Sequence, residues 1–295
     1  MKKVALKKLA RAAFGLATLT GLLFVLPQTS QSSQPISING CTTINSPGQY
    51  RLVADLTFAP GPADLPSSST CITIGASNVD LNLNGHTITG PGGGADGTAG
   101  ISVTAKTMVD IKGPGVITSF GRGIDFDGVT SSDVKQVTAT GNFFGFVVNN
   151  NSQGNLFREN TSTGNNQHGF TLNGAINNGF LNNVASNNGK VGILLFAGSG
   201  NQVKGNTTNG NGQDGILSGG GVSTGHSIKD NTASGNALFG IRLLAGSTGN
   251  NVKGNTAQDN NSTDLVDNNT NCDNNTWADN IFNTSNQSCI SGPAA

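Results

Sequence analysis

The chain has 295 residues, among them 43 glycines and 39 asparagines, and only 11% of its residues are charged. Helix-sustaining residues are scarce, since only one of the 16 acidic residues, Glu159, is a glutamate, while helix-interrupting Gly, Asn, Thr and Ser abound. This composition excludes a helical bundle or a helix-rich α/β enzyme, and the regular recurrence of Val, Ile, Leu and Phe excludes a disordered chain, so we expect an all-β protein of short strands and tight turns.

Residues 1–31 are predicted to be a bacterial-type signal peptide. An apolar run from about residue 12 to residue 26 follows five basic residues: Lys2, Lys3, Lys7, Lys8 and Arg11. A basic start and an apolar segment of this length are typical of a secretory leader, whereas an uncleaved anchor is the less favoured alternative because the run is short for a bilayer span. Its removal leaves 11 basic and 16 acidic side chains, which argues against a general nucleic-acid binder. We expect a secreted, periplasmic or cell-surface protein.

Four cysteines remain in the exported chain, and an even number in an oxidising compartment implies disulfides. Cys41 and Cys71 lie near the start, and Cys272 and Cys289 lie near the end. Of the three possible connectivities we favour Cys41–Cys71 with Cys272–Cys289, so that each bond fastens one end. Metal binding is less favoured because no two cysteines are closely spaced and the three histidines are scattered.

The centre of the chain repeats every 23 to 25 residues. One asparagine column is Asn160, Asn183, Asn206, Asn231 and Asn255, and a second is Asn142, Asn165, Asn188, Asn211, Asn236 and Asn260. A strand of the form Gly-apolar-x-x separates successive copies and starts at Gly145, Gly169, Gly192, Gly215 and Gly240. The repeats hold too few leucines for a leucine-rich repeat, whereas a β-solenoid stacks equivalent residues about 4.8 Å apart and uses asparagine in its turns. The repeat therefore predicts a β-solenoid.

Alternation along each strand predicts which side chains face the core. In the Gly-apolar strand these are Ile101, Ile124, Phe146, Phe170, Ile193, Ile216 and Ile241. In the other limb they are Val134, Phe157, Phe180, Val203, Ile228, Val252 and Trp277. Most phenylalanines are therefore expected in the core or the leader. Residues 79–264 are assigned to the coils, and residues 35–78 and 265–295 to disulfide-fastened caps that cover the open ends.

Several segments resemble secreted right-handed parallel β-helix proteins of the pectin-lyase-like superfamily. They are INSPGQYRLVADL (residues 44–56), CITIGASNVDLNLNGHTITG (residues 71–90), the NT-x-x-GN repeats and the terminal NNTWADNIFNTSNQSCI (residues 274–290). The resemblance covers nearly all of the exported chain and implies a right-handed parallel β-helix of about 8–10 coils. It implies no single activity, because the superfamily includes polysaccharide lyases, hydrolases, epimerases, adhesins and surface proteins.

One candidate catalytic and metal site lies in the segment GRGIDFDG. Asp125 and Asp127 are two residues apart and are expected to project outward together, where two carboxylates favour Ca²⁺ or shift each other's pKa. Arg122 could neutralise a uronate carboxylate or act on the proton alpha to it, and His168, two coils later and about 10 Å away, could be a general base. The alternative is a solvated aspartate pair beside an ordinary turn, since the equivalent positions of neighbouring coils hold no further acid.

A basic column is the candidate binding site, with a basic residue two positions before most repeat asparagines: Lys135, Arg158, Lys204, Lys229 and Lys253. Such a stripe could hold an acidic polysaccharide or lipopolysaccharide, or it could simply keep the outer face soluble. A Thr-x-Thr column is too irregular to favour ice binding. Copper delivery would need clusters of Met, His or Cys, and the chain has two methionines, one of them Met1, so we do not expect it.

The sequence favours an exported, non-catalytic protein that binds a polysaccharide or cell-surface glycan, or serves structurally in the envelope or extracellular space. The alternative is a Ca²⁺-dependent lyase or epimerase acting on acidic, uronate-containing glycans. Neither nucleic acid nor a transmembrane segment after signal removal is expected.

Overall fold

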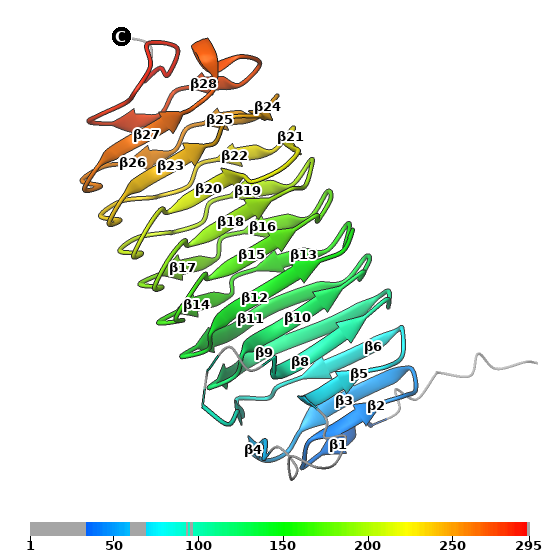
Figure 1. The fold of residues 1–295 in the computed structure, drawn as a ribbon. Coiled ribbons are helices and arrows are strands. Elements are labelled where there is room, and N and C mark those ends of the chain that lie inside the picture. Colours follow the sequence, from blue (N-terminus) through cyan, green and yellow to red (C-terminus); the bar gives the residue numbers. More distant parts are fainter. Residues whose placement is uncertain (1–33, 60–68, 93, 95–96, 294–295) are drawn as a thin grey trace, which may run out of the picture. The chain divides into compact units, whose positions relative to one another are not determined.

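The computed structural model describes residues 34–59, 69–92, 94 and 97–293, so the predicted signal peptide lies outside the described residues. The unit Gln34–Ala295 is compact, and its strands stack rung upon rung in two long parallel sheets (Figure 1). The predicted all-β parallel β-helix is confirmed, and one short 3₁₀ turn, η1 (Thr270–Cys272), is the only helical element among the described residues. None of these residues lies in a helix long and apolar enough to span a bilayer.

Sheet A follows one side of the solenoid. Its main path runs through β1 (Ile36–Ile38), β3 (Gly48–Leu52), β6 (Val79–Asn82), β9 (Val109–Thr118), β11 (Asp133–Thr140), β13 (Leu156–Arg158), β16 (Gly179–Leu181), β19 (Gln202–Lys204), β22 (Ser227–Lys229), β25 (Asn251–Lys253) and β28 (Thr276–Ala278). Short strands continue several rungs beyond a turn: β4 (Leu56–Thr57), β7 (Thr87–Thr89), β14 (Thr161–Thr163), β17 (Val184–Ser186), β26 (Thr256–Ala257) and β29 (Ile281–Phe282).

Sheet B carries the Gly-apolar strands. Its order is β2 (Thr42–Ile44), β5 (Thr70–Ile74), β8 (Ala99–Thr104), β10 (Arg122–Asp127), β12 (Phe144–Asn149), β15 (Phe170–Asn173), β18 (Ile193–Phe196), β20 (Ile216–Gly219), β23 (Phe239–Leu243) and β27 (Thr263–Asp267). A separate pair joins β21 (Ser223–Thr224) to β24 (Ser247–Thr248). Strands on both sides of residue 79 pair in the same sheets, and the proposed boundary between caps and coils stays a prediction.

The predicted inward residues are all buried, which confirms the assignment of the two columns to the core. Phenylalanines from successive rungs stack almost parallel inside the solenoid. The ring centroids of Phe146 and Phe170 are 4.5 Å apart, and those of Phe157 and Phe180 are 4.9 Å apart. Each buried aromatic side chain contributes about 1.5–3 kcal/mol through burial, so this stack anchors the middle of the unit.

Asparagine ladders close the turns. In a typical rung, the backbone N–H and the Nδ2 amide of Asn183 both donate to Asn206 Oδ1, at 2.8 and 3.0 Å. Asn183 Nδ2 also donates to the Phe157 carbonyl at 2.9 Å, so the side chain satisfies backbone groups that the turn leaves unpaired. The two predicted columns form such ladders. A third ladder was not recognised from the repeats of the sequence. It contains Asn155, Asn178, Asn201, Asn250 and Asn275.

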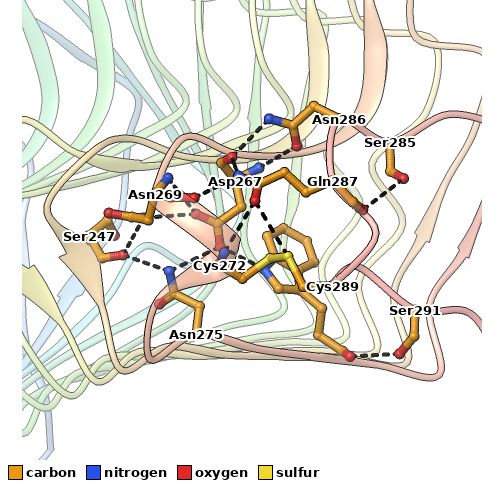
Figure 2. Close-up of a disulfide and its surroundings, with 11 residues drawn as sticks. Ser247, Asp267, Asn269, Cys272, Asn275, Ser285, Asn286, Gln287, Cys289 and Ser291 are labelled. Carbon is orange, nitrogen blue, oxygen red and sulfur yellow. Dashed lines mark hydrogen bonds between the residues drawn. A yellow bond between two sulfur atoms is a disulfide. The ribbon is translucent and has the colours of Figure 1, made fainter.

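Both favoured disulfides are present, Cys41–Cys71 and Cys272–Cys289. Figure 2 shows the C-terminal bond beside a buried polar network centred on Asp267. Asp267 Oδ1 accepts the backbone and side-chain N–H groups of Asn269, and Oδ2 accepts Asn275 Nδ2 and the Trp277 indole N–H. These bonds satisfy the carboxylate although it is fully buried, which burial of a charge requires.

Candidate functional site

Arg122 and Asp125 form an ion pair on the outer face of sheet B. Arg122 Nη1 donates to Asp125 Oδ2 at 2.8 Å, and Asn149 Nδ2 lies 3.5 Å from Asp125 Oδ1. The Asp125 side chain is only 11% exposed, so the pair differs from the solvated aspartates of the alternative interpretation. Burial raises the pKa of Asp125, and the nearby Arg122 charge opposes that shift. The carboxylate therefore serves first to fix the guanidinium.

The two aspartates are engaged by different partners. Asp127 Oδ1 accepts Asn150 Nδ2 at 2.6 Å, whereas Asp125 is engaged by Arg122. Ca²⁺ takes six to eight oxygen ligands. Over the described part of the chain, no group of three or more His, Cys, Asp or Glu side chains could hold a metal ion, so a Ca²⁺ ion here would need backbone, amide or water oxygens as well, and the metal site at Asp125 and Asp127 stays a prediction.

His168 lies two rungs from Arg122, with Phe144 between them. The Phe144 and His168 rings stack at a centroid distance of 5.8 Å. His168 Nδ1 accepts the Val191 backbone N–H at 3.1 Å, and burial, together with the charge of Lys190, lowers the pKa of His168 to about 4. At neutral pH the ring is therefore neutral with its proton on Nε2. No contact in the structure brings it together with Asp125, whose partners are Arg122 and Asn149.

Two phenylalanines beside Arg122 are exceptions to the expectation that most phenylalanines lie in the core or the leader. Phe143 and Phe144 are half-buried, and their rings meet edge to face at 4.9 Å. With Arg122, Gly97 and Gly121 they line a cavity of about 120 Å³. The adjacent pair in NFFG was the available signal, because alternation can direct only one of two neighbours inward.

A second arginine–aspartate pair lies on the same face. Asp214 Oδ2 accepts Arg242 Nη2 at 2.6 Å and Nε at 3.1 Å, and the Arg242 guanidinium carbon lies 4.5 Å from the centre of the Phe239 ring. The Asp214 side chain is 0% exposed. Burial raises the pKa of Asp214, and the charge of Arg242 and the Phe239 backbone N–H oppose that shift. No signal in the sequence indicated this pair, because Asp214 lies 28 residues from Arg242.

The basic column stacks on sheet A as its spacing predicts. Lys135 pairs with Arg158, Lys204 with Lys229, and Lys229 with Lys253, each in register on neighbouring strands. Lys112 extends the column by one more rung. Acidic partners accompany it: Arg158 with Asp133 at 2.6 Å, Lys253 with Asp279 at 3.0 Å, and Lys204 with Asp230 at 3.8 Å. Much of the positive charge of this face is therefore offset locally.

A protein family described as "Periplasmic copper-binding protein (NosD)" matches residues 82–294. The chain belongs to this NosD family. No curated protein matches it at a significant level.

Solved structures similar to this NosD-family protein are parallel β-helices that differ in activity. The A-module of the Azotobacter vinelandii mannuronan C-5 epimerase AlgE6 superposes with a TM-score of 0.57 at 18% identity, covering 84% of this chain and 81% of that one. The periplasmic alginate epimerase AlgG superposes with a TM-score of 0.60 at 14% identity, covering 84% of this chain and 59% of that one. The Dettilon tailspike protein gp208 superposes with a TM-score of 0.58 at 16% identity, covering 84% of this chain and 54% of that one. These likenesses show the fold alone, and the chain spans little more than half of the latter two.

The residues of this NosD-family protein do not fit a copper site. Copper favours clustered imidazole, thiolate or thioether ligands. All four cysteines are in disulfides, and each histidine is engaged separately: His86 Nδ1 with Asp55, His168 Nδ1 with the Val191 N–H, and His226 Nδ1 with the Asn201 N–H. Met108 is the sole methionine within the described ranges.

Proposed function

We propose that this protein is an exported, non-catalytic glycan-binding protein of the periplasm or cell surface, and that the outer face of sheet B carries its binding site. The observation that supports the proposal is the cavity beside Arg122. There a guanidinium fixed by a buried carboxylate lies next to the Phe143 and Phe144 rings. Aromatic rings offer apolar faces to sugar C–H groups, and arginine pairs with carboxylates in a bidentate manner, so the cavity suits an acidic glycan.

The way in which the titratable groups are occupied supports a non-catalytic role. Asp125 is paired with Arg122, and His168 has its acceptor nitrogen bonded to the Val191 N–H. General acid–base chemistry needs a proton donor and a proton acceptor within reach of one substrate atom. These side chains offer fixed recognition groups instead.

A direct binding test uses the exported protein and a glycan array, followed by calorimetry with soluble alginate, pectate and neutral glycans. Phe144→Ala and Arg122→Gln are each expected to weaken binding to an acidic glycan by roughly tenfold, the loss of about 1–2 kcal/mol for one aromatic or charged contact. Unchanged affinity in both variants would remove the cavity from the proposal.

The basic column is the alternative surface for the same function. Lys135 and Lys229 are the natural probes, because the structure records no ion pair for either among the described residues. The double variant Lys135→Gln/Lys229→Gln is expected to bind as the wild type does if sheet B carries the site. Selective loss of binding in this variant would move the site to sheet A.

A uronate lyase or epimerase is the second candidate function, as one similar structure is a mannuronan C-5 epimerase and another is an alginate epimerase. The observation in its favour is Asp125, because burial raises its pKa and proton-transferring carboxyl groups need such a shift. Incubation with pectate and alginate, with and without Ca²⁺, tests it. New unsaturated ends or an altered uronate composition that disappear in Asp125→Asn would establish this function and overturn the non-catalytic one.

A further inference from the structure

Arg242 is fixed on two sides, and part of its guanidinium remains free. Asp214 accepts Nε and Nη2, and the Phe239 ring lies beside the guanidinium plane. Nη1 has no partner among the described residues, and the side chain is 21% exposed. A guanidinium held in this way presents its remaining N–H groups to solvent in one orientation, which reduces the entropy lost when it binds a carboxylate.

Stability alone does not account well for the Asp214–Arg242 pair. Asp214 is completely buried, and its Oδ1 atom has no hydrogen-bond partner of ordinary geometry among the described residues, although the Phe239 backbone N–H is near enough to favour the charged carboxylate. The free-energy cost of removing two charges from water usually offsets the free energy gained from their attraction, so buried pairs contribute little net stability. An incompletely satisfied carboxylate that nevertheless bonds Arg242 twice is better explained by the positioning of the arginine.

The two arginine–aspartate pairs lie on one continuous face. Asp125 is in register with Val147, and the same column continues through Thr171, Leu194 and Leu217 to Arg242. Five strand spacings of about 4.8 Å separate Asp125 from Arg242, a distance of about 24 Å. The four intervening residues of this column carry no charge and are apolar except for Thr171, so this strip of the face lies between one arginine–aspartate pair at each end.

We propose that Arg242 is a second anion-anchoring site, and that it selects a linear polyanionic glycan long enough to reach from Arg122 to Arg242. This inference rests on the proposed glycan-binding function and specifies its ligand as an extended chain of uronate units. Two anchors on one chain make the second contact intramolecular, so affinity rises once the ligand can span both sites.

The experiment measures the affinity of the exported protein for purified oligouronates of increasing length, from disaccharides to chains well beyond about 24 Å when extended. The wild type is expected to gain at least about tenfold in affinity when the ligand passes that span. Arg242→Gln alone would leave Asp214 buried and unpaired, so the double variant Asp214→Asn/Arg242→Gln is the main test. Arg51→Gln, which removes one exposed charge from β3 and lies outside both candidate binding surfaces, is the matched control.

The double variant is expected to lose the gain for long chains and to keep wild-type affinity for short ones, whereas Arg122→Gln weakens both. A wild-type affinity that rises with length identically in the double variant would overturn the second anchor and leave the proposed function intact. Equal affinity for all lengths in the wild type would also overturn it. Absence of binding to any uronate oligomer would instead contradict the proposed function, and with it the anchor.

Discussion

His226 Nδ1 accepts the backbone N–H of Asn201 at 3.1 Å, at the point where neighbouring rungs of the third ladder place an asparagine oxygen. The other ring nitrogen, Nε2, lies 3.1 Å from Ser223 Oγ, and the His226 backbone N–H donates to Asn250 Oδ1 at 2.8 Å. Because Nδ1 accepts, the ring is neutral with its proton on Nε2. The histidine thus continues the ladder only in its neutral form.

This geometry predicts that acid weakens the solenoid at His226. Burial lowers the pKa of His226 from 6.5 to about 4. Between these two pH values, His226 is therefore protonated in the unfolded chain and neutral in the folded chain. Stability is unaffected by this group above about pH 6.5 and falls as the pH drops towards 4, by up to about 3 kcal/mol. His226→Asn restores the residue found elsewhere in the ladder and is expected to remove this loss.

Urea unfolding at pH 7 and pH 4.5 checks the prediction. His168, whose pKa is also lowered to about 4, contributes its own acid sensitivity, so His168→Asn is the comparison and the double variant should lose both effects. An equal drop in stability between the two pH values for the wild type and His226→Asn would contradict it.

The ladder predicts a large effect for Asn206→Ala. Asn206 Oδ1 accepts two N–H groups of Asn183, and Nδ2 donates to the Phe180 carbonyl and to Asn231 Oδ1. The alanine variant leaves buried backbone groups without partners, at a cost of about 2–3 kcal/mol. Hydrogen exchange should show reduced protection of the amides of Asn183 and its neighbours. The exposed Asn261→Ala is the control and is expected to change stability by less than about 0.5 kcal/mol.

The C-terminal disulfide is expected to keep the last rung closed. Cys272 and Cys289 enclose a loop with a sequence separation of 17, and losing such a cross-link costs about 3 kcal/mol in the chain-entropy description. Cys272→Ala/Cys289→Ala should therefore unfold earlier, with the first loss of hydrogen-exchange protection around β28. Exchange that increases first in the middle of the solenoid would show that this bond does not limit opening.

Copper binding is expected to be absent despite the family description. Because the cysteines are bonded to each other and the histidines are engaged one by one, the exported protein without an affinity tag should bind neither Cu(I) nor Cu(II) stoichiometrically. Equilibrium dialysis with metal analysis measures this. A stoichiometrically bound copper ion would contradict the prediction, and its loss in a His86→Gln variant would place the metal at that histidine.

The repeat accounts for much of the fold. The spacing of Asn160 and Asn183 predicted the stacked turns, and the alternation around Phe146 predicted the core. The third ladder was missed because His226 interrupts its run of asparagines, which hid the column from a comparison based on residue identity.

The residues alone predicted the period, the inward faces and the stacking of the basic column, because each depends on equivalent residues lying one strand spacing apart. The favoured pairing of the cysteines could also be predicted, because two of them lie near each end of the exported chain. Only the tertiary structure showed which outward-facing side chains contact one another. Asp214 bonds Arg242 across 28 residues, Phe144 stacks on His168, and Asp125 bonds Arg122 rather than facing water. The rotamer of a long side chain depends on its neighbours on adjacent rungs, and the period of the repeat does not predict that rotamer.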